Sequence, residues 1–127
     1  MKNLYILLLS LISINSFAQT EVMSMMGVQE HVFRTLQDDF FYESKDTLVI
    51  EQENGNLVNY IFKGGIVDHA IIVRSANQMT TTLTWLETLT KEDDYYFYSM
   101  NDHLYGLFLM ELMDESYFGL FVTRMPD

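Results

Sequence analysis

The 127-residue sequence contains no cysteine, only one proline and few basic side chains. Without cysteine the chain can form no disulfide and offers no thiol for lipid attachment, so its stability has to come from a packed core. The composition can supply such a core, because 49% of the residues are hydrophobic and 14% are aromatic. The missing thiol also removes one common class of catalytic nucleophile.

Basic residues are outnumbered, with seven lysines and arginines against eighteen aspartates and glutamates and a formal charge of −11. A chain of this charge repels nucleic acids and anionic membrane surfaces. The compatible partners are a basic protein, a metal cation or a neutral glycan. Solubility alone is another explanation of the acidic surface.

Residues 1–18 have the three parts of a secretory signal peptide. Lys2 provides the basic start, an apolar run too short to span a bilayer follows, and the segment closes on the small residue Ala18. Cleavage after Ala18 is therefore expected, with residues 19–127 forming one exported domain, periplasmic or secreted. No later apolar run is long enough to anchor the product in a membrane.

The stretch from Thr47 to Arg74 predicts two consecutive β-hairpins, around which the rest of the chain is organised. Asn54-Gly55 and Gly64-Gly65 are suited to positive φ at both central positions of type I′ turns. Two-residue loops would place Tyr60 opposite both Val49 and His69. Because side chains alternate, one face then collects Val49, Val58, Tyr60, Phe62, Val67, Ile71 and Val73.

Two helices are expected to cover this sheet. The first runs from Met23 to about Asp39, with apolar residues at helical spacing, namely Met25, Val28, Val32, Leu36 and Phe40, and with Phe33 widening this stripe. The second begins with the Ser-x-x-Gln form of a capping box at Ser75 and continues to about Lys91. The threonines at positions 80, 81, 82 and 84 would also suit a strand, and that alternative stays open.

Three more strands are predicted at Tyr95 to Met100, Leu104 to Met113 and Tyr117 to Arg124. The middle strand is apolar on both parities, which is typical of a central strand in a sheet covered on both faces. The predicted fold is α+β, with an antiparallel sheet of five or six strands and two helices packed on one face. Its order, α-βββ-α-βββ, is one that a duplicated unit would produce.

The segment from Gly27 to Leu36 resembles the opening helix of small exported α-β-β-β domains of the BamE and β-lactamase-inhibitor-protein type. Those domains have a valine six positions after the glycine and a leucine or methionine four positions later, whereas here Val32 lies five positions after Gly27 and Leu36 matches. The family's following Gly-x-Pro and the lipid-bearing cysteine of BamE have no counterpart. The resemblance implies a protein-binding module of the cell envelope.

Each of the three histidines directly follows an acid, at Glu30-His31, Asp68-His69 and Asp102-His103. Adjacent residues point apart on a helix and to opposite faces on a strand, so no such acid is expected to orient its neighbouring imidazole. The chain also lacks Gly-x-Ser-x-Gly and His-Glu-x-x-His motifs. We therefore expect a protein that is not an enzyme and carries no cofactor.

Met23-Ser24-Met25-Met26, close to His31, could offer thioether and imidazole ligands to Cu(I). The competing interpretation is that methionines at the start of an amphipathic helix fill the core.

Tyrosines and acids cluster in the last third of the sequence. Alternation sends Tyr96 and Tyr98 to the face opposite Tyr95 and Phe97, so one pair is core and the other, if exposed, forms a flat amphipathic surface. The candidate interaction surface consists of Tyr96, Tyr98, Tyr105, Tyr117, Asp93, Asp94, Asp114 and Glu115. The expected function is binding of a basic protein, in an inhibitor or immunity-type role for example. The alternatives are a tyrosine border around a small core, and a small-molecule, glycan or soft-metal binder.

Overall fold

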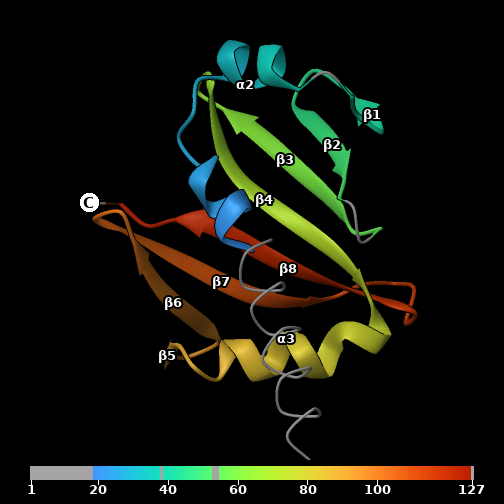
Figure 1. Ribbon diagram of the computed structural model, residues 1–127, viewed down its shortest axis with the longest axis vertical. Coiled ribbons are helices and arrows are strands. Elements are labelled where there is room, and N and C mark those ends of the chain that lie inside the picture. The colour runs from blue at the N-terminus through green and yellow to red at the C-terminus, as the bar shows by residue number, and fades with distance from the viewer. Residues whose placement is uncertain (1–18, 38, 53–54, 127) are drawn as a thin grey trace, which may run out of the picture.

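The computed structural model describes residues 19–37, 39–52 and 55–126. The predicted signal peptide and Asn54 of the first predicted turn lie outside these residues. The described chain is an α+β domain whose eight strands form a single antiparallel sheet (Figure 1). The predicted class is confirmed, but the predicted number of strands and their order are wrong.

The helical segments are residues 19–24, α2 (Glu30–Leu36), the short 3-10 turn η1 (Ala76–Gln78) and α3 (Met79–Leu86). The strands are β1 (Tyr42–Glu43), β2 (Thr47–Glu51), β3 (Leu57–Lys63), β4 (Ile66–Ser75), β5 (Thr90–Glu92), β6 (Tyr95–Met100), β7 (His103–Glu111) and β8 (Tyr117–Arg124). Their order across the sheet is β1-β2-β3-β4-β8-β7-β6-β5. The chain thus forms two four-stranded meanders joined through β4 and β8, in place of the predicted groups of three.

The predicted first helix is interrupted at Gly27, which takes φ +84°, a left-handed conformation in which helices commonly end. The chain then runs beside the start of β4. The backbone N–H of Gly27 donates to the carbonyl of Val67 at 2.8 Å, and the N–H of Val67 donates to the carbonyl of Val28 at 2.9 Å. This pairing with β4 satisfies backbone groups that a continuous helix would have satisfied internally.

The helix that resumes after this break buries Phe33, the residue that widens the predicted apolar stripe, more deeply than the other members of that stripe. Phe33 is fully buried, with its ring centroid 4.6 Å from that of Tyr60 and 5.7 Å from that of Phe62. Val32 and Leu36 of the predicted stripe are 40% and 64% exposed. Burial of an aromatic ring of this size contributes about 2–3 kcal/mol, so Phe33 is the anchor of α2.

The hairpin between β2 and β3 is one residue out of the predicted register. Tyr60 lies opposite Leu48, where the prediction had Val49. The backbone N–H of Gln52 donates to the carbonyl of Asn56 at 2.8 Å, so these two residues close the turn. The loop is therefore longer than the predicted two residues. A shift of one residue exchanges the two faces of a strand, so Leu48 joins the face of Tyr60.

The second hairpin has the predicted two-residue loop, but its register changes further along. Gly64 and Gly65 take φ of +62° and +78°, and Lys63 lies opposite Ile66. Ile61 and Phe62 pair with His69 and Val67, which leaves Asp68 as an extra residue in a β-bulge. As a result Ala70, and not His69, lies opposite Tyr60.

The second helix is shorter than predicted, because α3 ends at Leu86 and the chain enters the edge strand β5. No side-chain cap hydrogen bond forms at Ser75, so the predicted capping box is wrong. The threonine-rich sequence is nevertheless helical, and the hydroxyl of Thr84 donates to the carbonyl of Thr80 at 2.8 Å. Strands β6 and β8 have the predicted bounds.

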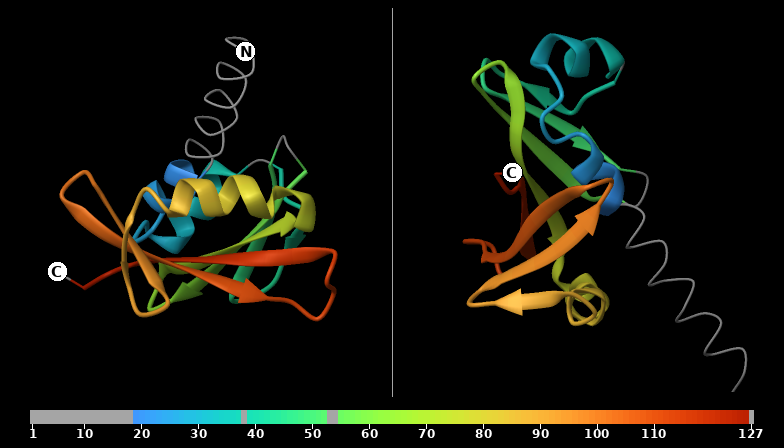
Figure 2. Two further views of the ribbon diagram at one scale, coloured as in Figure 1. Left: turned by 90° about the horizontal axis from the view of Figure 1, so that it is seen from below. Right: turned by 90° about the vertical axis from the view of Figure 1, so that its left-hand side faces the viewer.

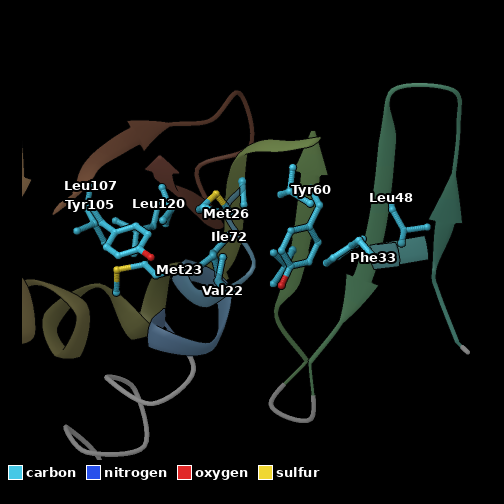
Figure 3. Packing of buried hydrophobic residues seen from close by; sticks show 14 of the residues in the cluster. Val22, Met23, Met26, Phe33, Leu48, Tyr60, Ile72, Tyr105, Leu107 and Leu120 are labelled. Carbon is cyan, nitrogen blue, oxygen red and sulfur yellow. The ribbon is translucent and has the colours of Figure 1, made fainter. Parts of the chain in front are cut away.

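All helices pack on one face of the sheet, as Figure 2 shows. In Figure 3 Val22, Met23 and Met26 lie over Tyr105, Leu107, Leu120 and Ile72, while Phe33 lies between Tyr60 and Leu48. Met23 and Met26 are 0% and 4% exposed, so the core interpretation of these two methionines is the one that the packing favours over copper ligation. Within the described residues no helix has the length and apolar character needed to span a bilayer.

Candidate functional site

The face of the sheet opposite the helices, which we call the open face, carries a row of mainly apolar residues. Directly paired residues of antiparallel strands point to the same side, so the pairing assigns its members. Its central row crosses all eight strands and consists of Tyr42, Val49, Asn59, Ile71, Phe121, Phe108, Tyr95 and Glu92. Figure 2 shows no helix on this side among the described elements.

Two further rows flank the central one. The first consists of Glu51, Leu57, Val73, Gly119 and Met110. The second consists of Thr47, Ile61, His69, Thr123, Gly106, Phe97 and Thr90. The open face is therefore largely apolar in its central row, with Asn59, His69 and Thr123 as polar residues on the central strands and with Glu51, Glu92, Thr47 and Thr90 at the ends of the rows.

The aromatic rings of the open face contact one another. The ring centroid of Tyr95 lies 5.4 Å from that of Phe108 and 6.4 Å from that of Phe97. The imidazole of His69 lies 5.2 Å from the ring of Phe121. Tyr95 is 40% exposed, so this aromatic cluster reaches solvent.

Two glycines flatten this surface by letting neighbouring side chains lie across it. A Cβ at Gly106 would stand 3.0 Å from Sδ of Met125, and one at Gly119 would stand 3.3 Å from Cγ2 of Ile71. Both distances are too short for a relaxed contact. The glycines therefore let the open face be filled by side chains from adjacent positions.

Acidic residues lie around the open face. Glu51 and Glu92 end two of its rows, and both are exposed. The β5–β6 turn adds Asp93 and Asp94, and the β7–β8 turn adds Asp114 and Glu115, all exposed. Lys91 does not neutralise these negative charges on the open face. Its side chain lies on the opposite face, with Nζ 5.4 Å from the ring centroid of Tyr96. The surface thus combines an apolar centre with an acidic border.

The β-bulge brings one acid and one imidazole together on this face. Oδ2 of Asp68 lies 2.8 Å from Nδ1 of His69, so the expectation that no acid reaches its neighbouring histidine is wrong here. A hydrolytic dyad also needs a nucleophile beside the imidazole. The nearby hydroxyl of Thr123 instead donates to the backbone carbonyl of Asp68, at 3.5 Å.

The structure separates the predicted interaction residues into two groups. Tyr105 is 3% exposed within the core, and Tyr98 packs 6.0 Å from Trp85 on the helix-covered face, where Tyr96 also lies. The prediction that Tyr105 belongs to an exposed surface is wrong, because strand alternation turns it toward the helices. Tyr117 is 49% exposed and lies on the side of the open face.

The open-face residues Ile71, Phe97, Phe108 and Phe121 were not among the predicted interaction residues. The available signal was the apolar character of β7 on both parities, which was read as coverage of both faces. Within the described residues the helices cover only one face of the sheet, so the second apolar parity marks the open face.

A cavity of about 380 Å³ lies at one end of the open face. Its lining includes Phe41, Tyr117, Leu57, Val73 and Glu51. It is therefore continuous with the flanking row that contains Glu51, Leu57 and Val73. Comparisons of the chain with protein-family models, curated proteins and solved structures found no match.

Proposed function

We propose that this chain is an exported, non-enzymatic binding protein that docks a basic protein on its open face. The observation that carries the proposal is the row of Ile71, Phe121, Phe108 and Tyr95 on the face that no described helix covers, in which Tyr95 is exposed and the other three are half-buried. Export is supported by the signal-peptide pattern of residues 1–18.

The apolar centre supports a macromolecular partner. Contiguous apolar patches on soluble proteins are usually small, and larger ones bordered by polar residues are typical of interaction sites. The open face also supplies exposed tyrosine, a residue type enriched among the energetically dominant residues of interfaces.

The charge supports a basic partner over a second copy of this chain. Two copies docked face to face would bring the acidic borders together, and each chain carries a formal charge of −11. Like charges brought together at an interface cost several kcal/mol, whereas a basic border on the partner is attracted. The aromatic centre would then contribute most of the binding free energy. Electrostatic attraction by the acidic border would mainly raise the association rate.

In the test, three forms of the protein are immobilised and exposed to the envelope fraction of the source cell. The proteins that each form retains are then compared. The forms are the wild type, Tyr95→Ser on the open face and Leu36→Ser, which removes an exposed apolar side chain from α2. A protein that the wild type and Leu36→Ser retain and Tyr95→Ser loses is then purified and its binding kinetics measured.

We expect that partner to be basic and Tyr95→Ser to weaken binding by about 2 kcal/mol, mainly through faster dissociation. Raising the salt from low to physiological strength should slow association, since charges are then screened beyond about 8 Å. An acidic partner, or equal binding by Tyr95→Ser, would contradict the proposal. A dimer in sedimentation that Tyr95→Ser abolishes would assign the face to a second copy.

A further inference from the structure

The cavity at the end of the open face is open to solvent and is lined by the ends of four strands and the segment before β1. Glu51 ends β2, Leu57 begins β3, Val73 lies near the end of β4 and Tyr117 begins β8. Phe41 is held beside them because its backbone N–H donates to the carbonyl of Val49 at 2.8 Å. The cavity is therefore built by the sheet itself.

Two aromatic side chains and two aliphatic ones form the apolar part of its lining. Phe41 and Tyr117 are 66% and 49% exposed, so both rings are accessible to a ligand. Leu57 and Val73 lie directly opposite each other on β3 and β4. Aromatic rings attract cations, and aliphatic side chains suit the methylene stem of a long side chain.

A pair of amides contributes polar groups of fixed orientation. Nδ2 of Asn56 donates to Oε1 of Gln78 at 3.3 Å, and Nε2 of Gln78 donates to Oδ1 of Asn56 at 3.1 Å. Asn56 is 2% exposed, so this pair is held in place by its surroundings. The two amides thus give the cavity a polar wall of fixed geometry.

The charged groups of the cavity are of one sign. Among the described residues that line it, Glu51 is the only acid, and none is a lysine, arginine or histidine. Glu51 forms no ion pair with any residue that the structure describes. Asp114 and Glu115 stand just before Tyr117 and make the local potential more negative.

We propose that this cavity receives one arginine or lysine side chain of the partner, an inference that rests on the binding function proposed above. The stem lies along Leu57 and Val73, and the cationic head lies between the rings and the carboxylate of Glu51. The volume of about 380 Å³ is at the lower end of ligand pockets, which accommodates a single side chain and part of its backbone.

The test uses blocked amino acids as probes of the whole protein in solution. N-acetyl-arginine methylamide and N-acetyl-lysine methylamide supply the two cationic heads, and the citrulline analogue has nearly the shape of the arginine compound without its charge. Binding is followed by NMR through the side-chain amide signals of Asn56 and Gln78. We expect saturable shifts in the millimolar range with a cationic compound and binding about tenfold weaker with citrulline.

Glu51→Gln should weaken binding of the cation about tenfold, because it removes the charge within the cavity. Glu87→Gln is the matched control, since it removes the same charge from an exposed position at the end of α3, outside the open face, and should leave binding of the cation unchanged. The relative affinity for the two cationic compounds tells whether the cavity prefers a guanidinium or an ammonium group.

Equal binding of citrulline, or an equal effect of Glu51→Gln and Glu87→Gln, would overturn the inference. Shifts of the same signals with glucose but with neither cationic compound would overturn it in favour of a sugar. Absence of cation binding while the partner still requires Tyr95 would reject the cavity and leave the binding function intact. Loss of the Tyr95 requirement would reject the binding function by itself.

Discussion

Oδ2 of Asp68 lies 2.8 Å from Nδ1 of His69, the next residue in β4. Neighbouring residues of a regular strand point to opposite faces, so this contact depends on the β-bulge at Asp68. The same bulge turns Ala70 and Ile72 toward the helices, and it places His69 and Ile71 on the open face. One extra residue thus decides which half of β4 forms the core and which half forms the candidate interaction surface.

Deletion of Asp68 should therefore destabilise the fold far more than Asp68→Ala. Without the extra residue, either Val67, which is 1% exposed, or the remainder of β4 has to change faces. Exposure of one such side chain costs about 2 kcal/mol, and loss of strand pairing adds to this. Asp68→Ala keeps the backbone and should cost about 0.5 kcal/mol or less. Urea unfolding measures both, and equal midpoints would show that the bulge does not set the register.

Two glycines with nearly the same backbone conformation provide a matched test of crowding. Gly27 and Gly55 take φ of +84° and +85°. A Cβ at Gly27 would stand 3.1 Å from Nη1 of Arg124, whereas one at Gly55 would meet no atom within 4 Å. Gly55→Ala should cost about 1–2 kcal/mol through backbone strain alone, and Gly27→Ala should cost more. Equal losses of unfolding free energy would mean that Arg124 moves aside without cost.

Tyr60 should make the protein sensitive to strong alkali. Its burial raises the pKa of the hydroxyl far above the ordinary value of 10.0, and the carboxylate of Glu21 raises it further. Above pH 10 the unfolded state loses this proton while the folded state keeps it. Stability should therefore fall with rising pH by up to about 1.4 kcal/mol per unit, and this loss is absent below the unfolded pKa.

The matched variant is Tyr60→Phe, which should lose this part of the alkaline sensitivity and differ little from wild type at pH 8.

Arg74 changes the pH dependence of stability in the opposite direction. Burial lowers the pKa of Arg74 from 12.5 to about 10, so between those values the unfolded state binds more protons and stability rises with pH. Because wild type and Tyr60→Phe share Arg74, its effect cancels in their difference. Parallel stability curves from pH 8 to pH 11 would contradict the prediction.

The buried hydrogen bond between β4 and α3 should appear as a coupling energy. Nη1 of Arg74 donates to Oγ1 of Thr82 at 3.1 Å, and both residues are 0% exposed. We expect Thr82→Val to cost about 1–2 kcal/mol less in an Arg74→Met background than in the wild type. A double-mutant cycle by urea unfolding measures this difference. Additive losses would show that the contact does not couple helix and sheet.

Short-range patterns were sufficient for several elements of the fold. The bounds of β6 and β8 follow from alternation between polar breaks, and the second hairpin follows from Gly64-Gly65, which favours φ above zero at both positions. The acidic turns at Asp93 and Asp114 were located in the same way. Each of these features depends on a few neighbouring residues, so the local sequence contains the necessary information.

The sequence alone determined the α+β class and most of the strands. It also showed that the chain is acidic and that β7 is apolar on both parities. Only the tertiary structure decided which parity faces the helices, because both are apolar and the choice depends on the register set at Asn56 and Asp68. The short edge strands β1 and β5 also form only through pairing with their neighbours. The open face was missed for this reason, since exposure of a sheet face is a property of what packs on the whole sheet and not of any one strand.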